Sequence, residues 1–263
     1  MGKLCNVAKE RKIVSIKIGT YNIQHGVDRL HLLKTKEVKL DLKLIEEAVR
    51  KMDLDICGLN EVWNHPMIEG IEGECNQAKV IAERLGYPYY FFAKAIPHGK
   101  GGEYGNALIS KYPILSTRCV PLHIPVEERV VEKGYYEDRV ILVAEISING
   151  NVLTVLNSHF GLNSDEIDQA IEVVREVVQE CKTPLLLMGD LNFFPSQIYY
   201  SKLCEILTDT ATLMNNAQNT FTSEDPQYRI DYIFINDQVK ILSNSVPEII
   251  ASDHRPYTVV AEI

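Results

Sequence analysis

Short apolar runs recur along this chain and alternate in several places with segments of helical periodicity. Runs typical of β-strands occupy residues 14–21, 55–59, 107–109, 139–148, 151–157, 184–188, 230–235 and 257–263. Apolar residues at steps of three and four predict helices over residues 38–52, 77–85, 164–181 and 198–207. A chain that mixes both kinds of segment in this order has to cover its sheets with helices, which indicates a layered α/β fold.

The connections limit the topology further. Asn149-Gly150 separates two of the predicted strands, and this dipeptide is the strongest short signal for a β-hairpin. Because hairpin neighbours are antiparallel while strands joined through a helix are parallel, we predict mixed sheets. Ser164 is the candidate N-cap of the helix that follows the hairpin. The polar stretches 96–102 and 215–227 are predicted to be surface loops.

The amino-acid composition indicates a globular protein rather than a disordered or membrane-spanning one. Of 263 residues, 46% are hydrophobic and 24% are charged, which is ordinary for a globular chain. We predict one catalytic domain over residues 13–263, preceded by a polar N-terminal tail over residues 1–12. No apolar run resembles a secretory signal or a transmembrane segment, so we predict a cytoplasmic protein whose scattered cysteines are reduced. The net charge of −9 disfavours a dedicated nucleic-acid binder, although it leaves a local basic patch possible.

Polar residues capable of chemistry stand where the apolar runs end. A carboxylate, amide or imidazole at such a place is held by a rigid strand beside the core. Taken singly, each could be an ordinary turn or cap residue, because Asn and Asp are common there. Together they favour a functional site, and they are Asn22, Glu61, His159, Asp190, Asn192, Asp231, Asp253 and His254.

These residue types fit the hydrolysis of a phosphoester. Glu61, Asp190 and Asp253 offer the hard oxygen atoms that Mg²⁺ or Mn²⁺ prefers. The two histidines can donate to a phosphate or move a proton near neutral pH. Asp231 can orient a histidine, and the two asparagines can fix a carboxylate or a water. The set predicts metal-assisted attack of water on phosphorus.

The segments that carry these residues resemble the endonuclease/exonuclease/phosphatase superfamily, whose members include pancreatic-type deoxyribonuclease, abasic-site endonucleases, neutral sphingomyelinases and inositol polyphosphate 5-phosphatases. Each motif alone is weak, but all occur in the family's order from about residue 14 to the C-terminus. They are Thr20-Tyr21-Asn22-Ile23-Gln24-His25-Gly26, Leu59-Asn60-Glu61-Val62, Asn157-Ser158-His159, Gly189-Asp190-Leu191-Asn192-Phe193-Phe194-Pro195, Arg229-Ile230-Asp231-Tyr232-Ile233 and Ser252-Asp253-His254-Arg255-Pro256.

The resemblance implies a four-layer α/β/β/α sandwich of two mixed β-sheets flanked by helices, with the site where the sheets meet. It also implies one divalent ion, Mg²⁺ or Mn²⁺. Glu61 would be its chief ligand, with Asn22 beside it, and Asp253 would bind it directly or through water.

The catalytic roles carry over in the same way. Asp190 would position or deprotonate the attacking water, which Asn192 would orient. His254, paired with Asp231, would contact the scissile phosphate as base or as stabiliser of the transition state. His159 would donate a hydrogen bond to a phosphate oxygen. The sequence leaves open whether Asp190 or His254 is the base.

Departures from the abasic-site branch point towards sphingomyelinase-like and uncharacterised bacterial hydrolases. Gln24 stands where the repair enzymes usually carry an aspartate, and Phe193-Phe194-Pro195 follows the Asp190 motif. The segment 104–114 also matches that bacterial branch. Within these matches, Arg139 and Asn106 are candidate contacts to the substrate phosphate, the alternative for Arg139 being a surface salt bridge.

The histidines and the tryptophan near the motifs could belong to the site or be structural. His25 could line the pocket or serve as a turn residue, and Trp63 could wall the site or pack in the core. His65 and His98 are predicted to be surface or loop histidines.

Three functions therefore compete. The first is a divalent-metal-dependent phosphodiesterase or phosphatase acting on a small or lipid-like phosphoester, with no obligate protein partner. The second is a Mg²⁺-dependent nuclease on DNA or RNA, which would need a basic groove despite the net charge. The third is a catalytically inactive binding module on the same fold, which the full set of site residues disfavours.

Overall fold

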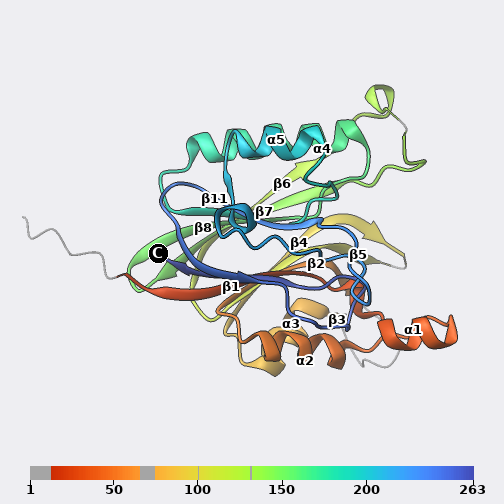
Figure 1. Cartoon of the computed structure of the whole chain (residues 1–263). Helices are drawn as coiled ribbons and strands as arrows, with labels where there is room; N and C mark the ends of the chain where they lie inside the picture. The colour runs from red at the N-terminus through yellow and green to blue at the C-terminus, as the bar shows by residue number, and fades with distance from the viewer. Residues whose placement is uncertain (1–12, 66–74, 100, 131) are drawn as a thin grey trace, which may run out of the picture.

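The computed structural model of the chain describes residues 13–65, 75–99, 101–130 and 132–263, and the predicted tail over residues 1–12 lies outside them. Two β-sheets are stacked face to face (Figure 1). The order in the first sheet is β12 (Lys240–Ser245), β13 (Tyr257–Glu262), β1 (Ser15–Asn22), β2 (Ile56–His65), β5 (Gly102–Ser110) and β4 (Tyr89–His98), with β3 (Cys75–Asn76) paired to β2. The order in the second is β10 (Thr208–Asp209), β11 (Asp231–Ile235), β9 (Leu185–Asp190), β8 (Asn151–Ser158), β7 (Arg139–Ile148) and β6 (Ile114–Leu122).

Both sheets are mixed, as predicted. The pairs β1–β2 and β8–β9 are parallel, and the other strand pairs are antiparallel. The predicted hairpin between β7 and β8 is confirmed, with Ile148 opposite Asn151. Asn149 and Gly150 both have positive φ, 51° and 94°, which is the conformation that a two-residue I′ turn requires.

Helices cover the outer faces of the two sheets (Figure 1). Apolar residues of α2 (Leu42–Met52) and α3 (Gln77–Leu85) pack with the outer side chains of the first sheet. Those of α4 (Ser164–Glu180) and α5 (Ile198–Cys204) pack on the second sheet. The third core lies between the sheets, so the layers are α/β/β/α. The short elements are η1 (Gln24–Gly26), α1 (Arg29–Thr35), η2 (Val126–Glu128) and α6 (Thr210–Leu213).

The two sheets approach each other most closely at Gly58 of β2. A Cβ atom built there would lie 2.6 Å from Met188 Cε and 2.8 Å from Asn157 Oδ1. Asn157 of β8 donates from Nδ2 to the carbonyl oxygens of Leu59 and Ala107, at 3.1 and 2.8 Å. These bonds join the second sheet to the first at the end where the polar residues stand.

The structure corrects several predictions. The segment 96–102 is not a surface loop but the turn end of the β4–β5 hairpin, where His98 pairs with Gly102. Strands β4, β6 and β12 were missing from the prediction because they lie at sheet edges, where one or both faces are partly exposed and the apolar pattern is weak. Their place at the edges explains the weak sequence signal.

Two helix starts also differ. Asp41 caps α2 by accepting from Lys43 N, so the helix begins later than residue 38. Asn163 rather than Ser164 is the N-cap of α4, where Glu166 Oε2 accepts from Asn163 N at 3.1 Å. None of the helices in the described part of the chain is long and apolar enough to cross a membrane.

Candidate active site

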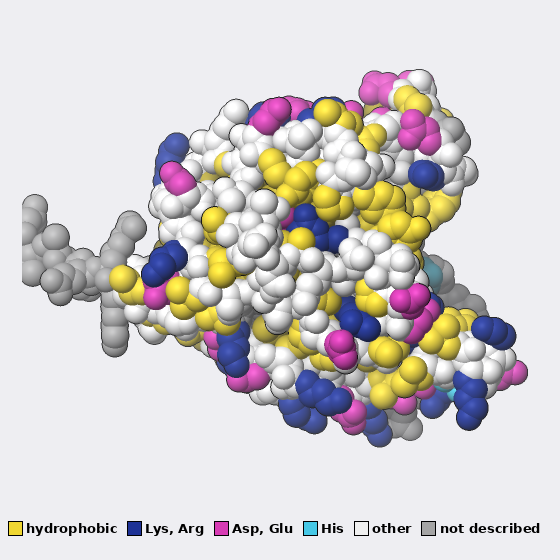
Figure 2. Space-filling model, viewed as in Figure 1, with side chains coloured by type: hydrophobic (Ala, Val, Ile, Leu, Met, Phe, Trp, Pro, Cys, Tyr) yellow, Lys and Arg dark blue, Asp and Glu magenta, His cyan; other side chains and the backbone are white. Residues whose placement is uncertain are grey.

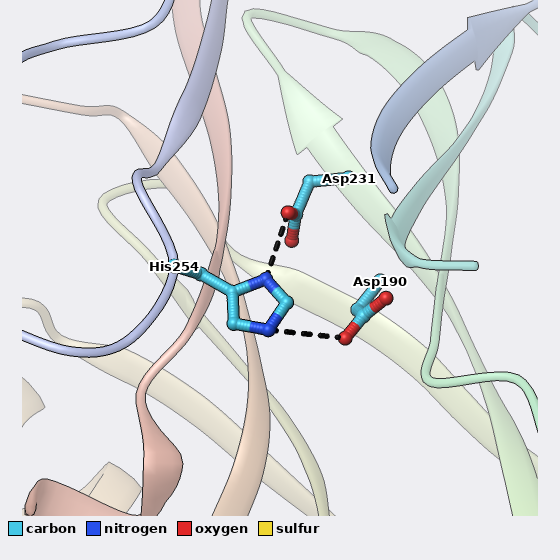
Figure 3. Close-up of side chains that lie close together, drawn as sticks. All are labelled: Asp190, Asp231 and His254. Atoms are coloured by element: carbon cyan, nitrogen blue, oxygen red, sulfur yellow. Dashed lines mark hydrogen bonds and ion pairs between the residues drawn. The ribbon is translucent and has the colours of Figure 1, made fainter. Parts of the chain in front are cut away.

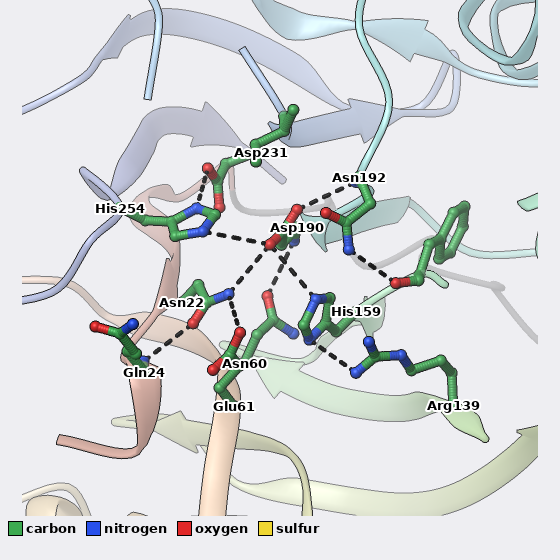
Figure 4. Close-up of polar contacts among 12 residues, drawn as sticks. Asn22, Gln24, Asn60, Glu61, Arg139, His159, Asp190, Asn192, Asp231 and His254 are labelled. Carbon is green, nitrogen blue, oxygen red and sulfur yellow. Dashed lines mark hydrogen bonds and ion pairs between the residues drawn. The ribbon is translucent and has the colours of Figure 1, made fainter. Parts of the chain in front are cut away.

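The predicted polar residues meet at one end of the sandwich, between the two sheets (Figure 4). Asn22 ends β1, Glu61 lies on the adjacent parallel strand β2, and Asp190 ends β9. His159 follows β8, and Asp231 begins β11 directly opposite Asp190. Asn192, Asp253 and His254 lie in the adjoining loops. The sequence therefore identified side chains that the topology brings together from both sheets.

Glu61 sits at an irregularity of its strand. The register between β2 and β5 shifts between Leu59 and Val62, so the strand bulges at Asn60 and Glu61. Glu61 has φ of 56°, a conformation that a side chain larger than glycine rarely adopts. The bulge turns its carboxylate towards Asn22, whose Nδ2 donates to Glu61 Oε1 at 3.0 Å and to Asp190 Oδ2 at 3.1 Å.

His254 lies between two carboxylates (Figure 3). Its Nδ1 is 2.9 Å from Asp231 Oδ2, and its Nε2 is 3.5 Å from Asp190 Oδ2. Burial alone would lower the pKa of His254, but the charges of Asp231 and Asp190 outweigh it and raise the pKa to about 10. The imidazole is therefore protonated at neutral pH, with its Nε2–H facing the site.

His159, in contrast to His254, is neutral at neutral pH. Burial and the nearby Arg139 guanidinium lower the pKa of His159 well below its ordinary value. Arg139 Nη1 lies 3.2 Å from His159 Nδ1, and a guanidinium can only donate, so Nδ1 is the acceptor. The proton of the neutral ring is thus on Nε2, which lies 3.5 Å from Asp190 Oδ2. His159 also presents an N–H donor to the site.

Asp190 is the centre of this arrangement. Its Oδ1 accepts from Asn192 N at 3.1 Å, while its Oδ2 faces Asn22 and both histidines. Burial, with repulsion from Asp231 and Glu61, raises the pKa of Asp190 to about 7 against the opposing effect of His254. A carboxyl group in this range can accept a proton near neutral pH.

The donor set fits one divalent cation. Glu61 and Asp253 both line the cavity described below, and burial followed by repulsion from Glu61 raises the pKa of Asp253. Burial would also raise the pKa of Glu61, but His25, His159 and Asn22 lower it to about 2, so the carboxylate is ionised. Carboxylate oxygens that lie close enough to repel each other are ligands that Mg²⁺ or Mn²⁺ would neutralise.

A second group of ligand atoms lies beside the Glu61–Asn22 pair. Ligand atoms of Asp190, Asp231 and His254 lie within 4.8 Å of one another, so this group could also hold a metal ion. Both ring nitrogens of His254 already contact carboxylates in the structure, Nδ1 with Asp231 at 2.9 Å and Nε2 with Asp190 at 3.5 Å.

The site opens into a cavity of about 780 Å³. Aromatic rings form much of its wall, among them Tyr104, Tyr135, Tyr199, Phe221 and Tyr228. The catalytic end of the wall is formed by Glu61, His159, Asp190, Asn192, Asp253 and His254. The side chains that line this cavity in the described part of the chain include two cations, Lys133 and Arg139.

Arg139 and Asn106 have different surroundings. Arg139 is 6% exposed and contacts Oε2 of the partly exposed Glu137 at 2.8 Å, so this ion pair has a buried guanidinium and lies in the cavity wall. Asn106, in contrast, uses its amide internally. Its Nδ2 donates to Val140 O and its Oδ1 accepts from Asn60 Nδ2, both at 2.9 Å, and it is not among the lining residues. These contacts leave Asn106 in a sheet-to-sheet network rather than at the phosphate.

The sequence analysis missed several residues of the site. Asn60 Oδ1 accepts from Asp190 N at 3.0 Å, and Thr220 Oγ1 donates to Asp231 Oδ2. Tyr104, Phe221 and Tyr228 line the cavity. Asn60 could have been found, because it stands next to Glu61 in the same motif. The aromatic residues could not, because an aromatic residue in a loop has the same sequence signature whether it lines a cavity or packs in a core.

Comparisons with known proteins agree with this geometry. The sequence profile of the endonuclease/exonuclease/phosphatase family matches residues 19–254. The uncharacterised protein YbhP of Escherichia coli is 26% identical, over 92% of this chain and 94% of its own. Exodeoxyribonuclease III of Haemophilus influenzae is 24% identical over 59% of this chain, and protein cwh43 of Schizosaccharomyces pombe 26% over 65%. The chain spans 53% of the length of exodeoxyribonuclease III and 15% of the length of protein cwh43.

Solved structures share the fold. An endonuclease/exonuclease/phosphatase structure from Beutenbergia cavernae superposes with a TM-score of 0.76 at 23% identity, covering 95% of this chain and 72% of that one. The mannosyl-6-phosphatase Bt3783 of Bacteroides thetaiotaomicron superposes with a TM-score of 0.69 at 17% identity, covering 94% and 99%. Since the family profile spans nearly the whole chain and the four layers and the mixed sheets agree, the chain belongs to the endonuclease/exonuclease/phosphatase family.

Proposed function

We propose that this protein is a phosphoesterase that uses one divalent cation, Mg²⁺ or Mn²⁺, to hydrolyse a P–O bond of a small phosphoester. The observation that carries the proposal is the placement of Asp190 between the donors of two histidines and beside the Glu61–Asn22 pair. Glu61 and Asn22 would hold the cation, with Asp253 as a further ligand. When bound, the cation would withdraw charge from the phosphoryl oxygens and favour ionisation of water.

The protein's own groups supply the remaining steps. Asp190, with its pKa near neutrality, accepts the proton of the attacking water. Asn192 uses its Nδ2 on Phe160 O at 3.0 Å, which leaves its Oδ1 to accept a hydrogen bond from that water. His159 and protonated His254 donate from Nε2 to the phosphoryl oxygens. The raised pKa of His254 makes it the stabiliser and Asp190 the base. As the water oxygen bonds to phosphorus, the P–O bond to the leaving group breaks, and the leaving oxygen departs as the alcohol with a proton from solvent.

The cavity favours a small substrate over a polynucleotide. A nucleic-acid groove carries a continuous line of basic side chains. Here acidic and basic side chains are interspersed on the face seen in Figure 2, and the described lining of the cavity holds five acidic residues against two cations. The net charge of −9 would also repel a polyanion. A small ester neutralised by one cation avoids this repulsion.

The test is a substrate panel with metal-depleted protein. Sugar phosphates, p-nitrophenyl phosphate, bis-p-nitrophenyl phosphate, sphingomyelin, supercoiled plasmid and an abasic-site duplex would each be assayed with Mg²⁺, with Mn²⁺ and with EDTA. We expect a small ester to be hydrolysed and EDTA to abolish turnover. We also expect Glu61→Gln to lower kcat/KM by about 100-fold or more, because a chief ligand is lost. Glu83→Gln, on an exposed side chain of α3, is the matched control.

Each substrate class in the panel, and the EDTA control, has an outcome that would overturn part of the proposal. Hydrolysis of the plasmid or the abasic duplex, with the small esters intact, would replace the proposal by a nuclease. Hydrolysis of sphingomyelin alone would replace the small ester by a lipid substrate. Turnover that persists in EDTA, or that is equal in Glu61→Gln and the wild type, would reject the metal-dependent mechanism.

A further inference from the structure

A stack of rings lies next to the proposed cation site and is not used in the mechanism above. The indole of Trp63 stacks on the imidazole of His25, with ring centroids 4.2 Å apart and planes within 9°. It also stacks with His98, at 4.6 Å and 29°. The three rings come from β2, η1 and β4, so the stack joins three segments that are distant in sequence.

The inner ring of this stack contacts the proposed metal ligand. His25 Nδ1 lies 3.8 Å from Glu61 Oε2, the carboxylate oxygen opposite the one that Asn22 holds. His25 Nδ1 is buried and makes no hydrogen bond. A buried, unpartnered nitrogen at this distance is close enough to interact electrostatically with the carboxylate and to limit its rotation. The stack thus touches Glu61 on the side that Asn22 leaves open.

A buried amide links the backbones of the two stacked residues. Gln77 is 1% exposed, its Oε1 accepts from Trp63 N at 2.9 Å, and its Nε2 donates to His25 O at 2.7 Å. The relative position of Trp63 and His25 is therefore fixed at both the backbone and the rings. Trp63 in turn lies two residues after Glu61 on the bulged strand.

The backbone conformation of Glu61 and His25 explains why these segments need to be fixed. Glu61 and His25 both have positive φ, 56° and 43°. Residues other than glycine are strained in this conformation and keep it only where the surroundings impose it. A stack that fixes the segments on both sides would supply that constraint, and would hold the Glu61 carboxylate ready for a cation.

We propose that the His25–Trp63–His98 stack is a positioning device for Glu61 and sets the affinity of the proposed site for its divalent cation. This inference rests on the metal site of the proposed function. Trp63 and His98 act through His25 and Glu61 and touch no reacting atom, so they are positioning residues.

The first test uses fluorescence. Trp63 is the only tryptophan of the chain, so the intrinsic indole emission reports on this stack alone. Mg²⁺ itself absorbs no light in this range, so any change must come from the protein. We expect titration of metal-depleted protein with Mg²⁺ to change the emission of Trp63 along a saturable curve, and Glu61→Gln to abolish the change. A calorimetric Mg²⁺ isotherm without any change in emission would contradict the coupling between the stack and the site.

The second test measures Mg²⁺ affinity by calorimetry in Trp63→Leu, Trp63→Phe and His98→Leu. Loss of a group that orients a metal ligand typically weakens affinity about 10–100-fold, so we expect the Mg²⁺ Kd of Trp63→Leu to rise about tenfold or more. Trp63→Phe keeps a stacking ring and should stay within about threefold of the wild type. His98→Leu removes the outer ring alone and should give an intermediate Kd, which keeps the test valid if Trp63→Leu fails to fold.

Tyr90→Leu is the matched control, because Tyr90 is a partly exposed ring on the same strand as His98 but outside the stack. Thermal unfolding in EDTA shows that each variant is folded. Folded Trp63→Leu and His98→Leu with wild-type Mg²⁺ affinity would overturn the positioning role while leaving the proposed function intact. A wild-type protein that binds neither Mg²⁺ nor Mn²⁺ would overturn both.

Discussion

Two carboxylates face one imidazole at this site, and their surroundings give them different tasks. Asp231 Oδ2 lies 2.9 Å from His254 Nδ1 and also accepts from Thr220 Oγ1, so it is fixed on the side away from the cavity. Asp190 faces the cavity and Nε2 of both histidines. In the mechanism that we propose, the first carboxylate orients and charges His254, and the second accepts a proton from the attacking water.

Asp231→Asn tests this division. The variant keeps the shape of the side chain but removes the largest of the charges that raise the pKa of His254. We expect kcat to fall about 100-fold or more, the usual range for loss of a donor that stabilises the transition state, with KM within about threefold of the wild type. Steady-state kinetics on the substrate found in the panel would measure it. Asp237→Asn, on an exposed aspartate beyond β11, is the control, and a wild-type kcat in Asp231→Asn would refute the role.

At this scale the sequence predicted which residues meet better than it predicted the contacts they make. Asn22, Glu61 and Asp190 could be singled out because each polar side chain follows an apolar run. The sequence carried no sign that Glu61 sits on a bulge with positive φ, or that Trp63 stacks with His25 and His98. Both features depend on how β2, β4 and η1 meet in space, and no local pattern encodes that.

Among the elements, residues 132–138, which precede β7, form a wall of the cavity, and α4 fixes this wall in place. Glu132 and Lys133, which line the cavity, donate from their backbone nitrogens to Asn163 Oδ1, at 3.0 and 2.8 Å. Asn163 Nδ2 donates in turn to Tyr135 O at 2.8 Å. One buried N-cap residue thus joins the wall to the helix, and the wall is positioned to select the substrate.

Asn163→Ala should loosen this wall and leave the chemistry intact. The substitution removes three part-buried hydrogen bonds from the wall, so the conformation of the wall seen in the structure becomes less populated. We expect KM to rise about tenfold or more with kcat within about threefold. Hydrogen exchange of the wall should also speed up.

The control for this variant is Asn236→Ala. Asn236 bridges Leu185 N and Thr183 O in the same manner, but at the opposite end of β9 from Asp190. A KM increase of equal size in both variants would attribute the effect to general destabilisation rather than to the wall.

The elements also show where sequence patterns fail. The strands β1, β8 and β9, buried within the sheets, were predicted almost to the residue, whereas the edge strands β4, β6 and β12 were not. The burial of β4 shows the reason, because only Ala93 of its ten residues is fully buried. An edge strand takes its conformation from a neighbour whose position the local sequence does not specify.

For the whole molecule, function depends on the relation between the two sheets. Glu61 and Asn22 belong to the first sheet and Asp190 and His159 to the second, so the site exists only while the sheets keep their spacing. Buried asparagines maintain that relation: Asn157 donates to two carbonyl oxygens of the first sheet, and Asn60 accepts from Asp190 N. The order of the predicted elements indicated a layered α/β fold with mixed sheets, and the family resemblance implied the four layers, but neither indicated these cross-sheet bonds.

Asn157→Leu therefore should affect stability and activity together. Leucine has a similar volume but leaves Leu59 O and Ala107 O buried without their donors, at a cost of about 1–3 kcal/mol for each unpaired group. We expect the free energy of unfolding, measured by urea denaturation, to fall by about 3 kcal/mol, and kcat to fall because Glu61 and Asp190 no longer hold their separation. The control is Thr154→Val. Thr154 lies on the same strand as Asn157, and its hydroxyl forms a hydrogen bond with the hydroxyl of Thr183 rather than with the first sheet. This variant should therefore lower the free energy of unfolding but leave kcat unchanged. If Asn157→Leu were destabilised yet kept the wild-type kcat, the site would not depend on the cross-sheet bonds of Asn157, and the bulge at Glu61 with its ring stack would be sufficient to position the ligand.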